Sequence, residues 1–99
     1  MAMYDIKFSA GAFEDLAWFR KNEQNEIRDA IYDNLVYEPN VETRNRKQLR
    51  PNDTAEWELR IGKFRVFYNV DEVVYIVAIE AIAWKKGASL FFQGEEREL

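Results

Sequence analysis

The 99-residue sequence contains no cysteine and no histidine, and these two absences remove several kinds of active site. Without cysteine there is no disulfide, no thiolate nucleophile and no zinc–cysteine site. Without histidine the commonest general base and metal ligand is missing, which excludes hydrolysis by a histidine-based catalytic triad. Any chemistry must therefore use other side chains.

Long apolar runs are also absent. No run approaches the ~20 residues that a membrane-spanning helix needs, and the start lacks the basic segment and apolar core of a secretory signal. These absences predict a soluble, cytoplasmic protein. A composition that is 47% apolar and 15% aromatic predicts a folded globule, and the length predicts a single domain over residues 1–99.

The net charge of −4 is unevenly distributed along the chain. Between Arg44 and Arg65 seven bases stand against three acids, a local charge of +4 that leaves −8 for the remainder. An acidic protein with one basic segment can offer that segment to a polyanion or to an acidic partner. The seven bases are Arg44, Arg46, Lys47, Arg50, Arg60, Lys63 and Arg65.

The densest apolar block predicts an antiparallel meander. Apolar and charged residues alternate in its first part, which is the pattern of a half-buried strand. Turn residues then divide the block at two points. The predicted elements are a strand over Trp57–Ile61, a type II′ turn at Gly62–Lys63, a strand over Phe64–Val70, a turn at Asp71–Glu72 and a strand over Val73–Ala81.

This register places Arg60 directly opposite Arg65 on the face away from the core, and Arg65 opposite Ala78. Like charges in such a cross-strand pair destabilise a sheet by roughly 0.2–1 kcal/mol. In one interpretation Glu58 and Glu80 partly neutralise the pair, which is then merely structural. In the other, the two arginines form an anion site, because a paired arginine row beside a small residue suits a phosphate.

Ahead of the meander the sequence predicts a strand and two helices that form an αα-hairpin. The predicted bounds are Met3–Phe8 for the strand, a first helix capped by Ser9 and ending near Lys21–Asn22, and a second helix over about Glu23–Tyr37 that Pro39 stops. Their apolar stripes run through Ala12, Phe13, Leu16 and Phe19, and through Ile27, Ala30, Ile31, Asn34 and Leu35. We therefore expect an α+β fold: an N-terminal strand, a two-helix hairpin over one sheet face, and an antiparallel meander of three or four strands.

Two further segments are open to more than one interpretation. Residues 40–53 are polar and basic, and they form either a simple solvated loop or part of an anion-binding surface. In both cases we expect Leu49 to pack on the sheet. Leu90–Phe92 form either a final short strand or a surface for a partner.

The residues from Trp57 to Tyr68 resemble the signature of the RelE/ParE toxins of type II toxin–antitoxin modules. That family shows an aromatic residue, then Arg, a hydrophobe, Gly, a polar residue, an aromatic, Arg, two hydrophobes and Tyr. Tyr4–Ser9, Pro39, the helical hairpin and the total length also match, so the resemblance covers nearly the whole chain. It implies a small sheet carrying two helices, and a cognate antitoxin protein that wraps the toxin and covers its active face.

The resemblance leaves three functions open, because a shared fold does not choose between them. RelE-like members are ribosome-dependent mRNA endonucleases that inhibit translation, with the ribosome and mRNA as partners. ParE-like members are non-enzymatic inhibitors of DNA gyrase. The third possibility is a non-toxic regulatory module that only binds an antitoxin.

For the RelE-like function, the resemblance implies that Arg60, Arg65 and Lys85 are the catalytic residues, which grip the scissile phosphate and stabilise charge in the transition state. No metal or cofactor is expected, because the 2′-hydroxyl of the RNA is the nucleophile. Further phosphate binding is expected from Arg44, Arg46, Lys47, Arg50 and Lys63. The chain departs from the family at two positions. Some RelE-like enzymes have a tyrosine near the C-terminus, and at or near that position this chain has Phe91, which lacks a hydroxyl. A strand position upstream that is often lysine in the family is Glu58 here. Candidates for the general base are Lys85, Lys63 and Glu58.

Overall fold

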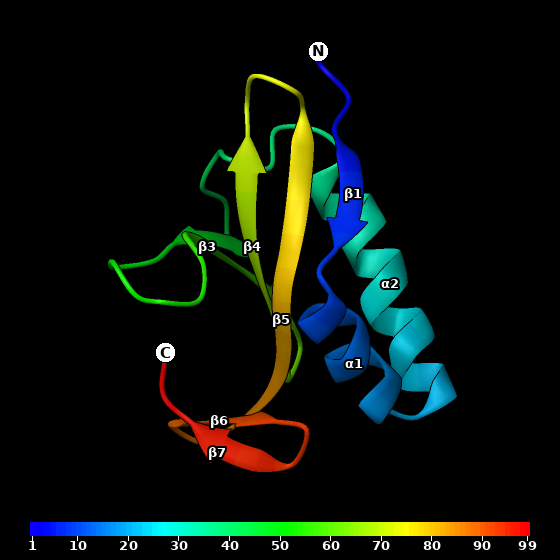
Figure 1. The fold of residues 1–99 in the computed structure, drawn as a ribbon, viewed down its shortest axis with the longest axis vertical. Helices are drawn as coiled ribbons and strands as arrows, with labels where there is room; N and C mark the ends of the chain where they lie inside the picture. Colours follow the sequence, from blue (N-terminus) through cyan, green and yellow to red (C-terminus); the bar gives the residue numbers. More distant parts are fainter.

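The computed structural model describes all residues 1–99, and it contains two helices and a seven-stranded sheet (Figure 1). The elements are β1 (Asp5–Phe8), α1 (Ala10–Trp18), α2 (Lys21–Leu35), β2 (Arg46–Gln48), β3 (Trp57–Ile61), β4 (Phe64–Asp71), β5 (Ile76–Lys86), β6 (Ser89–Phe92) and β7 (Glu95–Arg97). The strands from β2 to β7 are antiparallel neighbours in chain order, and β1 pairs in parallel with β5. The expected α+β class and the order strand, two helices, meander are confirmed.

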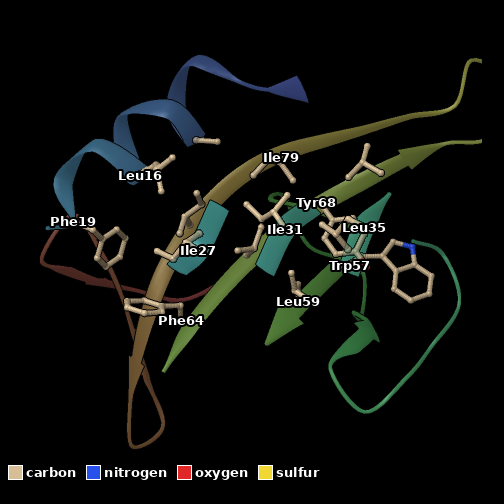
Figure 2. Close-up of a cluster of buried hydrophobic side chains, with 14 of the residues drawn as sticks. Leu16, Phe19, Ile27, Ile31, Leu35, Trp57, Leu59, Phe64, Tyr68 and Ile79 are labelled. Carbon is tan, nitrogen blue, oxygen red and sulfur yellow. The ribbon is translucent and has the colours of Figure 1, made fainter. Parts of the chain in front are cut away.

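The helices cover one face of the sheet and form the main core with it (Figure 1). Ile27, Ile31 and Leu35 lie one helical turn apart on α2, and all three are fully buried. They pack over inward-facing strand residues such as Leu59 and Ile79 (Figure 2). The stripe predicted for α2 therefore faces the sheet, as expected.

The opposite face of the sheet is not simply open, because it carries a second apolar cluster. Its members are Ala55, Phe67, Ala81, Ala83 and Phe92, with Leu49 and Leu90 packed against them. Phe67 is fully buried although it points away from the helices. The packing of Leu49 on the sheet is confirmed, and this face has an apolar floor.

The β3–β4 hairpin has the predicted register, with Trp57 opposite Tyr68 and Arg60 opposite Arg65. Gly62 has a φ of 55°, the positive value that the first central residue of a type II′ turn requires. The two-residue turn at Gly62–Lys63 is confirmed.

The predicted β4–β5 register is wrong. The turn at Asp71–Glu72 is in fact a four-residue loop over residues 72–75, because the Asp71 carboxylate accepts hydrogen bonds from the backbone N–H groups of Val73 and Val74. The register also shifts between Phe67 and Tyr68, which leaves Glu80 of β5 without a partner. As a result Arg65 lies opposite Ala83 and not Ala78.

Several element bounds also differ from the predictions. α1 ends at Trp18 and α2 at Leu35, each two or more residues earlier than expected, and Phe13 is 63% exposed and lies outside the core. Leu90–Phe92 form part of β6, which was the first of the two interpretations. The meander exceeds three or four strands, because β2 and β7 were not predicted. Neither helix is long and apolar enough to cross a membrane.

Tyr68 connects the core to the segment after α2, and this contact yields a stability prediction. The side chain is fully buried, and its hydroxyl donates a 2.7 Å hydrogen bond to the Pro39 carbonyl. We expect Tyr68→Phe to lower the free energy of unfolding by about 1–3 kcal/mol, because the buried carbonyl loses its partner. Denaturant unfolding measures the change. Tyr32 is half-exposed, so Tyr32→Phe is the control, and its free energy of unfolding should stay near that of the wild type.

The same variant tests the ionisation of the phenol. Burial raises the pKa of Tyr68 well above its ordinary value of 10.0, with Arg46 opposing the shift. The unfolded phenol therefore loses its proton as pH rises past 10 while the folded one keeps it, so this group contributes stability that falls with rising pH. Wild type should lose stability above pH 10 faster than Tyr68→Phe, and an equal loss would contradict the assignment.

Candidate functional site

Two arginines lie side by side on the sheet face that the helices do not cover. Arg60 of β3 and Arg65 of β4 are directly opposite each other, beside the Gly62 turn. Arg60 Nε lies 2.9 Å from Glu58 Oε1, a carboxylate in a residue that is only 8% exposed. Arg65 Nη1 donates to two backbone carbonyls of the hairpin, those of Gly62 at 2.7 Å and Phe64 at 2.8 Å.

The electrostatics of this pair favour an added anion. Burial lowers the pKa of the Arg65 guanidinium below its ordinary value, Glu58 acts in the opposite direction, and Arg60 lowers the pKa further. The partly desolvated charge of Arg65 has no carboxylate within ion-pair distance, because the Glu58 oxygen is bonded to Arg60. A phosphate next to both guanidinium groups would compensate the burial and the repulsion.

Other bases share this face. Lys47 of β2 lies opposite Glu58, and Lys85 stands two residues beyond Ala83 on β5, which returns it to the face of Arg65. The partner of Lys85 on β6 is Leu90, a residue that packs on the second cluster. We call this surface the basic face; its bases are Lys47, Arg60, Arg65, Lys85 and Arg97.

The sequence interpretation missed Arg97. Leu90 lies opposite Lys85 on one side and opposite Arg97 of β7 on the other. The Arg97 guanidinium carbon lies 4.2 Å from the ring centre of Phe92, which belongs to the second cluster. The one local signal was Gly94: Gln93 and Gly94 have φ values of 51° and 81°, which match a type I′ hairpin turn, and glycine is favoured at the second central position of that turn.

The remaining predicted phosphate-binding residues do not join the basic face. Arg46 points to the helix side, where its Nη1 donates to the Asn34 carbonyl at the C-terminal end of α2 and its Nε to the Val41 carbonyl. The Lys63 ammonium lies 3.5 Å from a carboxylate oxygen of Glu23 on α2. Arg44 and Arg50 are exposed in the loop regions flanking β2.

Phe91 lies outside the basic face as well. It is opposite Trp84 on β5, and the two rings stack with their centres 4.8 Å apart. Alternation along β6 places Leu90 and Phe92, not Phe91, toward the arginines.

Asp15 of α1 holds the C-terminal hairpin in place. The neighbours of β5 on one edge are β1 over residues 76–79 and β6 over residues 84–86, which leaves the backbone between them without a strand partner on that edge. Within this gap Asp15 Oδ2 accepts the Ile82 N–H at 3.0 Å, and Oδ1 accepts the Gln93 amide at 2.8 Å. Asp15 is only 6% exposed, and its contact with the Ile82 N–H is buried, whereas its contact with the Gln93 amide is partly buried.

Comparison with known proteins places this architecture among solved toxin structures. The RelBE2 toxin–antitoxin complex of Mycobacterium tuberculosis matches at a TM-score of 0.75 with 24% identity, over 86% of this chain and 94% of that one. The archaeal RelE–RelB complex of Pyrococcus horikoshii matches at 0.67 with 20% identity, over 87% and 98% of the two chains. The chain has the fold of the RelE toxins.

A third RelE-like structure, the YoeB dimer of Staphylococcus aureus, matches at a TM-score of 0.54 with 26% identity, over 87% of this chain and 99% of that one. No family model matches the sequence, and no curated protein does either. The RelE-like fold, predicted above from the hairpin signature, is confirmed by these structures.

The position of Asp15 in this RelE-like fold predicts a local effect of its removal. Asp15→Ala leaves the Ile82 N–H and the Gln93 amide without their acceptor, so we expect a loss of about 1–3 kcal/mol in the free energy of unfolding. Hydrogen exchange should accelerate at the Ile82 amide and through β6 and β7 more than in α2. Glu14→Ala, an exposed neighbour, is the control; uniform acceleration over the whole chain would contradict a local role.

Proposed function

We propose that this protein is the toxin of a type II toxin–antitoxin system, a RelE-like ribosome-dependent mRNA endonuclease that inhibits translation in the cytoplasm. The observation that carries the proposal is the pair of guanidinium groups on the basic face, flanked by Lys47, Lys85 and Arg97. A row of cations over an apolar floor suits a nucleic-acid backbone, because it supplies charge along a strand.

In the proposed reaction the arginines neutralise the phosphate. The 2′-hydroxyl oxygen of the upstream nucleotide attacks phosphorus, the bond to the 5′-oxygen breaks, and the products are a 2′,3′-cyclic phosphate and a 5′-hydroxyl. Negative charge grows on the non-bridging oxygens, where Arg60 and Arg65 donate hydrogen bonds that strengthen in the transition state. The Arg65 guanidinium would exchange a carbonyl contact of its own hairpin for a phosphate oxygen.

We assign the two proton transfers to groups on the same face. The Glu58 carboxylate takes the proton of the 2′-hydroxyl, and the Lys85 ammonium gives one to the departing 5′-oxygen. Lys63, the third candidate for the base, is paired with Glu23 toward the helix side and has no role in this scheme.

We further propose a cognate antitoxin as the resting partner. Two of the structural neighbours were solved as complexes: one is the RelBE2 toxin–antitoxin complex and the other is the archaeal RelE–RelB complex. An acidic antitoxin segment lying across the basic face would neutralise the arginines and exclude RNA from them at the same time.

Arg65→Ala provides the sharper test of the two arginines. Its side chain makes its hydrogen bonds to backbone carbonyls at a partly exposed site, whereas loss of Arg60 leaves the buried Glu58 carboxylate without its partner and threatens the fold. We expect Arg65→Ala to abolish the growth arrest caused by wild-type expression while its thermal unfolding stays near wild type. A folded Arg65→Ala protein that still arrests growth would reject the proposal.

The nature of the damage separates the enzyme from the alternatives. Mapping of mRNA 5′ ends after induction should show cuts inside translated codons, with 5′-hydroxyl ends that require phosphorylation before ligation. Intact messages together with gyrase-linked DNA breaks would instead support a ParE-like inhibitor. Absence of growth arrest by wild type would support the regulatory module.

Two adjacent lysines give a matched pair for the proton donor. Lys85 lies on the basic face, while Lys86 is exposed on the opposite side of β5, so their removal changes the net charge equally. Lys85→Ala should reduce the rate of mRNA cleavage in a translation reaction by roughly 10²-fold or more, the usual worth of general acid–base catalysis. Lys86→Ala should cleave at the wild-type rate. An equal loss of rate in both variants would mean that Lys85 contributes only its net charge, and it would reject Lys85 as the proton donor.

A further inference from the structure

A pocket of about 450 Å³ lies on the other side of the Gly62–Lys63 turn from the arginines. It is formed where the end of α1, the start of α2, the β3–β4 turn and β5 meet. Its volume falls within the range of small-molecule sites in proteins. The lining residues are Trp18, Phe19, Arg20, Glu23, Lys63 and Trp84.

The aromatic walls of this pocket are held from behind. Trp84 stacks on Phe91 at 4.8 Å, and Trp18 meets Phe19 edge to face at 5.3 Å. The indole of Trp18 also lies against Gly94 in the β6–β7 turn, so closely that a Cβ added there would come within 3.1 Å of the ring. Rings that are fixed before a ligand arrives lose little conformational entropy on binding.

The charged rim gives the pocket a preference for an anion. Arg20 and Lys63 supply two cations against the single carboxylate of Glu23, which already accepts the Arg20 backbone N–H at 3.1 Å and lies 3.5 Å from the Lys63 ammonium. α2 begins at Lys21, and the positive end of a helix dipole adds to the same preference. A flat ring with an attached phosphate satisfies both halves of the pocket: the indoles stack on the ring, and the cations bind the phosphate.

We propose that this pocket binds a single nucleotide, with its base on Trp18 and Trp84 and its phosphate at Lys63 and Arg20. Trp18 is 49% exposed, so its indole face is accessible to a base that enters the pocket. In the RNA substrate the nucleotide is a neighbour of the scissile phosphate, a statement that rests on the proposed function. The nucleotide site itself does not depend on it.

The turn provides the connection between the pocket and the basic face. The Gly62 carbonyl accepts the Arg65 guanidinium, and the Lys63 carbonyl accepts the Lys85 backbone N–H at 2.7 Å. One turn therefore carries a pocket cation on one side and contacts two residues of the basic face on the other. A single strand of RNA that crosses the turn would place a phosphate at the arginines and an adjacent base between the tryptophans.

The three tryptophan indole N–H signals in a ¹⁵N–¹H spectrum test the site directly, because Trp57 lies in the core and serves as an internal control. Adenosine monophosphate should shift the Trp18 and Trp84 signals saturably and leave Trp57 unmoved. Adenosine should bind more weakly, and inorganic phosphate alone should not move either signal. A large excess of AMP that shifts none of the three signals, or shifts all three equally, would overturn the proposal.

Variants assign the two halves of the site. Trp84→Leu should weaken AMP at least about fivefold, the lower end of the cost of losing one base–aromatic stack. Lys63→Ala should weaken AMP, whose phosphate keeps only Arg20 as a cation, and leave adenosine unchanged, a pattern that a folding defect would not produce. Lys7→Ala, an exposed lysine of β1 outside the pocket lining, should bind as wild type. AMP binding that both pocket variants retain would overturn the site.

An oligonucleotide arm separates this inference from the proposed enzyme. Arg65→Ala should bind AMP as wild type does, because Arg65 lies outside the pocket. The trinucleotide ApApA should bind wild type more tightly than AMP, and Arg65→Ala should lose that advantage. ApApA that binds no more tightly than AMP would overturn RNA as the source of the nucleotide, while failure of AMP itself would overturn the pocket and leave the proposed function standing.

Discussion

The two-residue turn at Gly62–Lys63 is the constraint on which both the core and the basic face depend. A turn of this length fixes the pairing of β3 with β4, and a slip by one residue would send every side chain to the other face. The repulsion between Arg60 and Arg65 costs roughly 0.2–1 kcal/mol. Burial of a single side chain such as Leu59 contributes about 1.5–3 kcal/mol, so the core easily holds the arginines together. The guanidinium pair exists because the opposite face requires that register.

The same comparison explains which parts of the fold the sequence could predict. The β3–β4 hairpin is specified locally, by the alternation of apolar residues and by the glycine of its turn. The β4–β5 pairing is specified by tertiary contacts: the Asp71 side chain organises the loop, and Val73 is 88% exposed although its type suggested a strand. The bulge at Glu80 has no local pattern, because it fits the start of α1, where Ser9 Oγ donates to the Glu80 carbonyl. Periodicity contains none of these contacts.

The candidate site was predictable to a similar extent. The charge distribution identified a basic segment, but it could not show which of its residues lie on the basic face. Arg46 and Lys47 are neighbours that point to opposite faces because they belong to strand β2, and β2 was itself not predicted. Arg97 was missed because its position follows from two hairpins in succession, each of which had to be known. Asp15 has the sequence pattern of an ordinary surface acid on a helix, and its burial follows only from the gap between β1 and β6 on the edge of β5.

The acidic net charge of the chain is compatible with a site for anions because the two act over different distances. At physiological ionic strength the field of exposed charges decays over about 8 Å, so the remote carboxylates contribute little at the basic face. Next to the arginines the charge balance is local: Glu58 compensates Arg60, and Arg65 carries a charge that burial and its neighbour both disfavour. A phosphate bound there, as we propose, would relieve this unfavourable electrostatic energy, whereas at an ordinary surface arginine it would displace only water. The proposed anion would therefore bind at the point where the core has forced two like charges together.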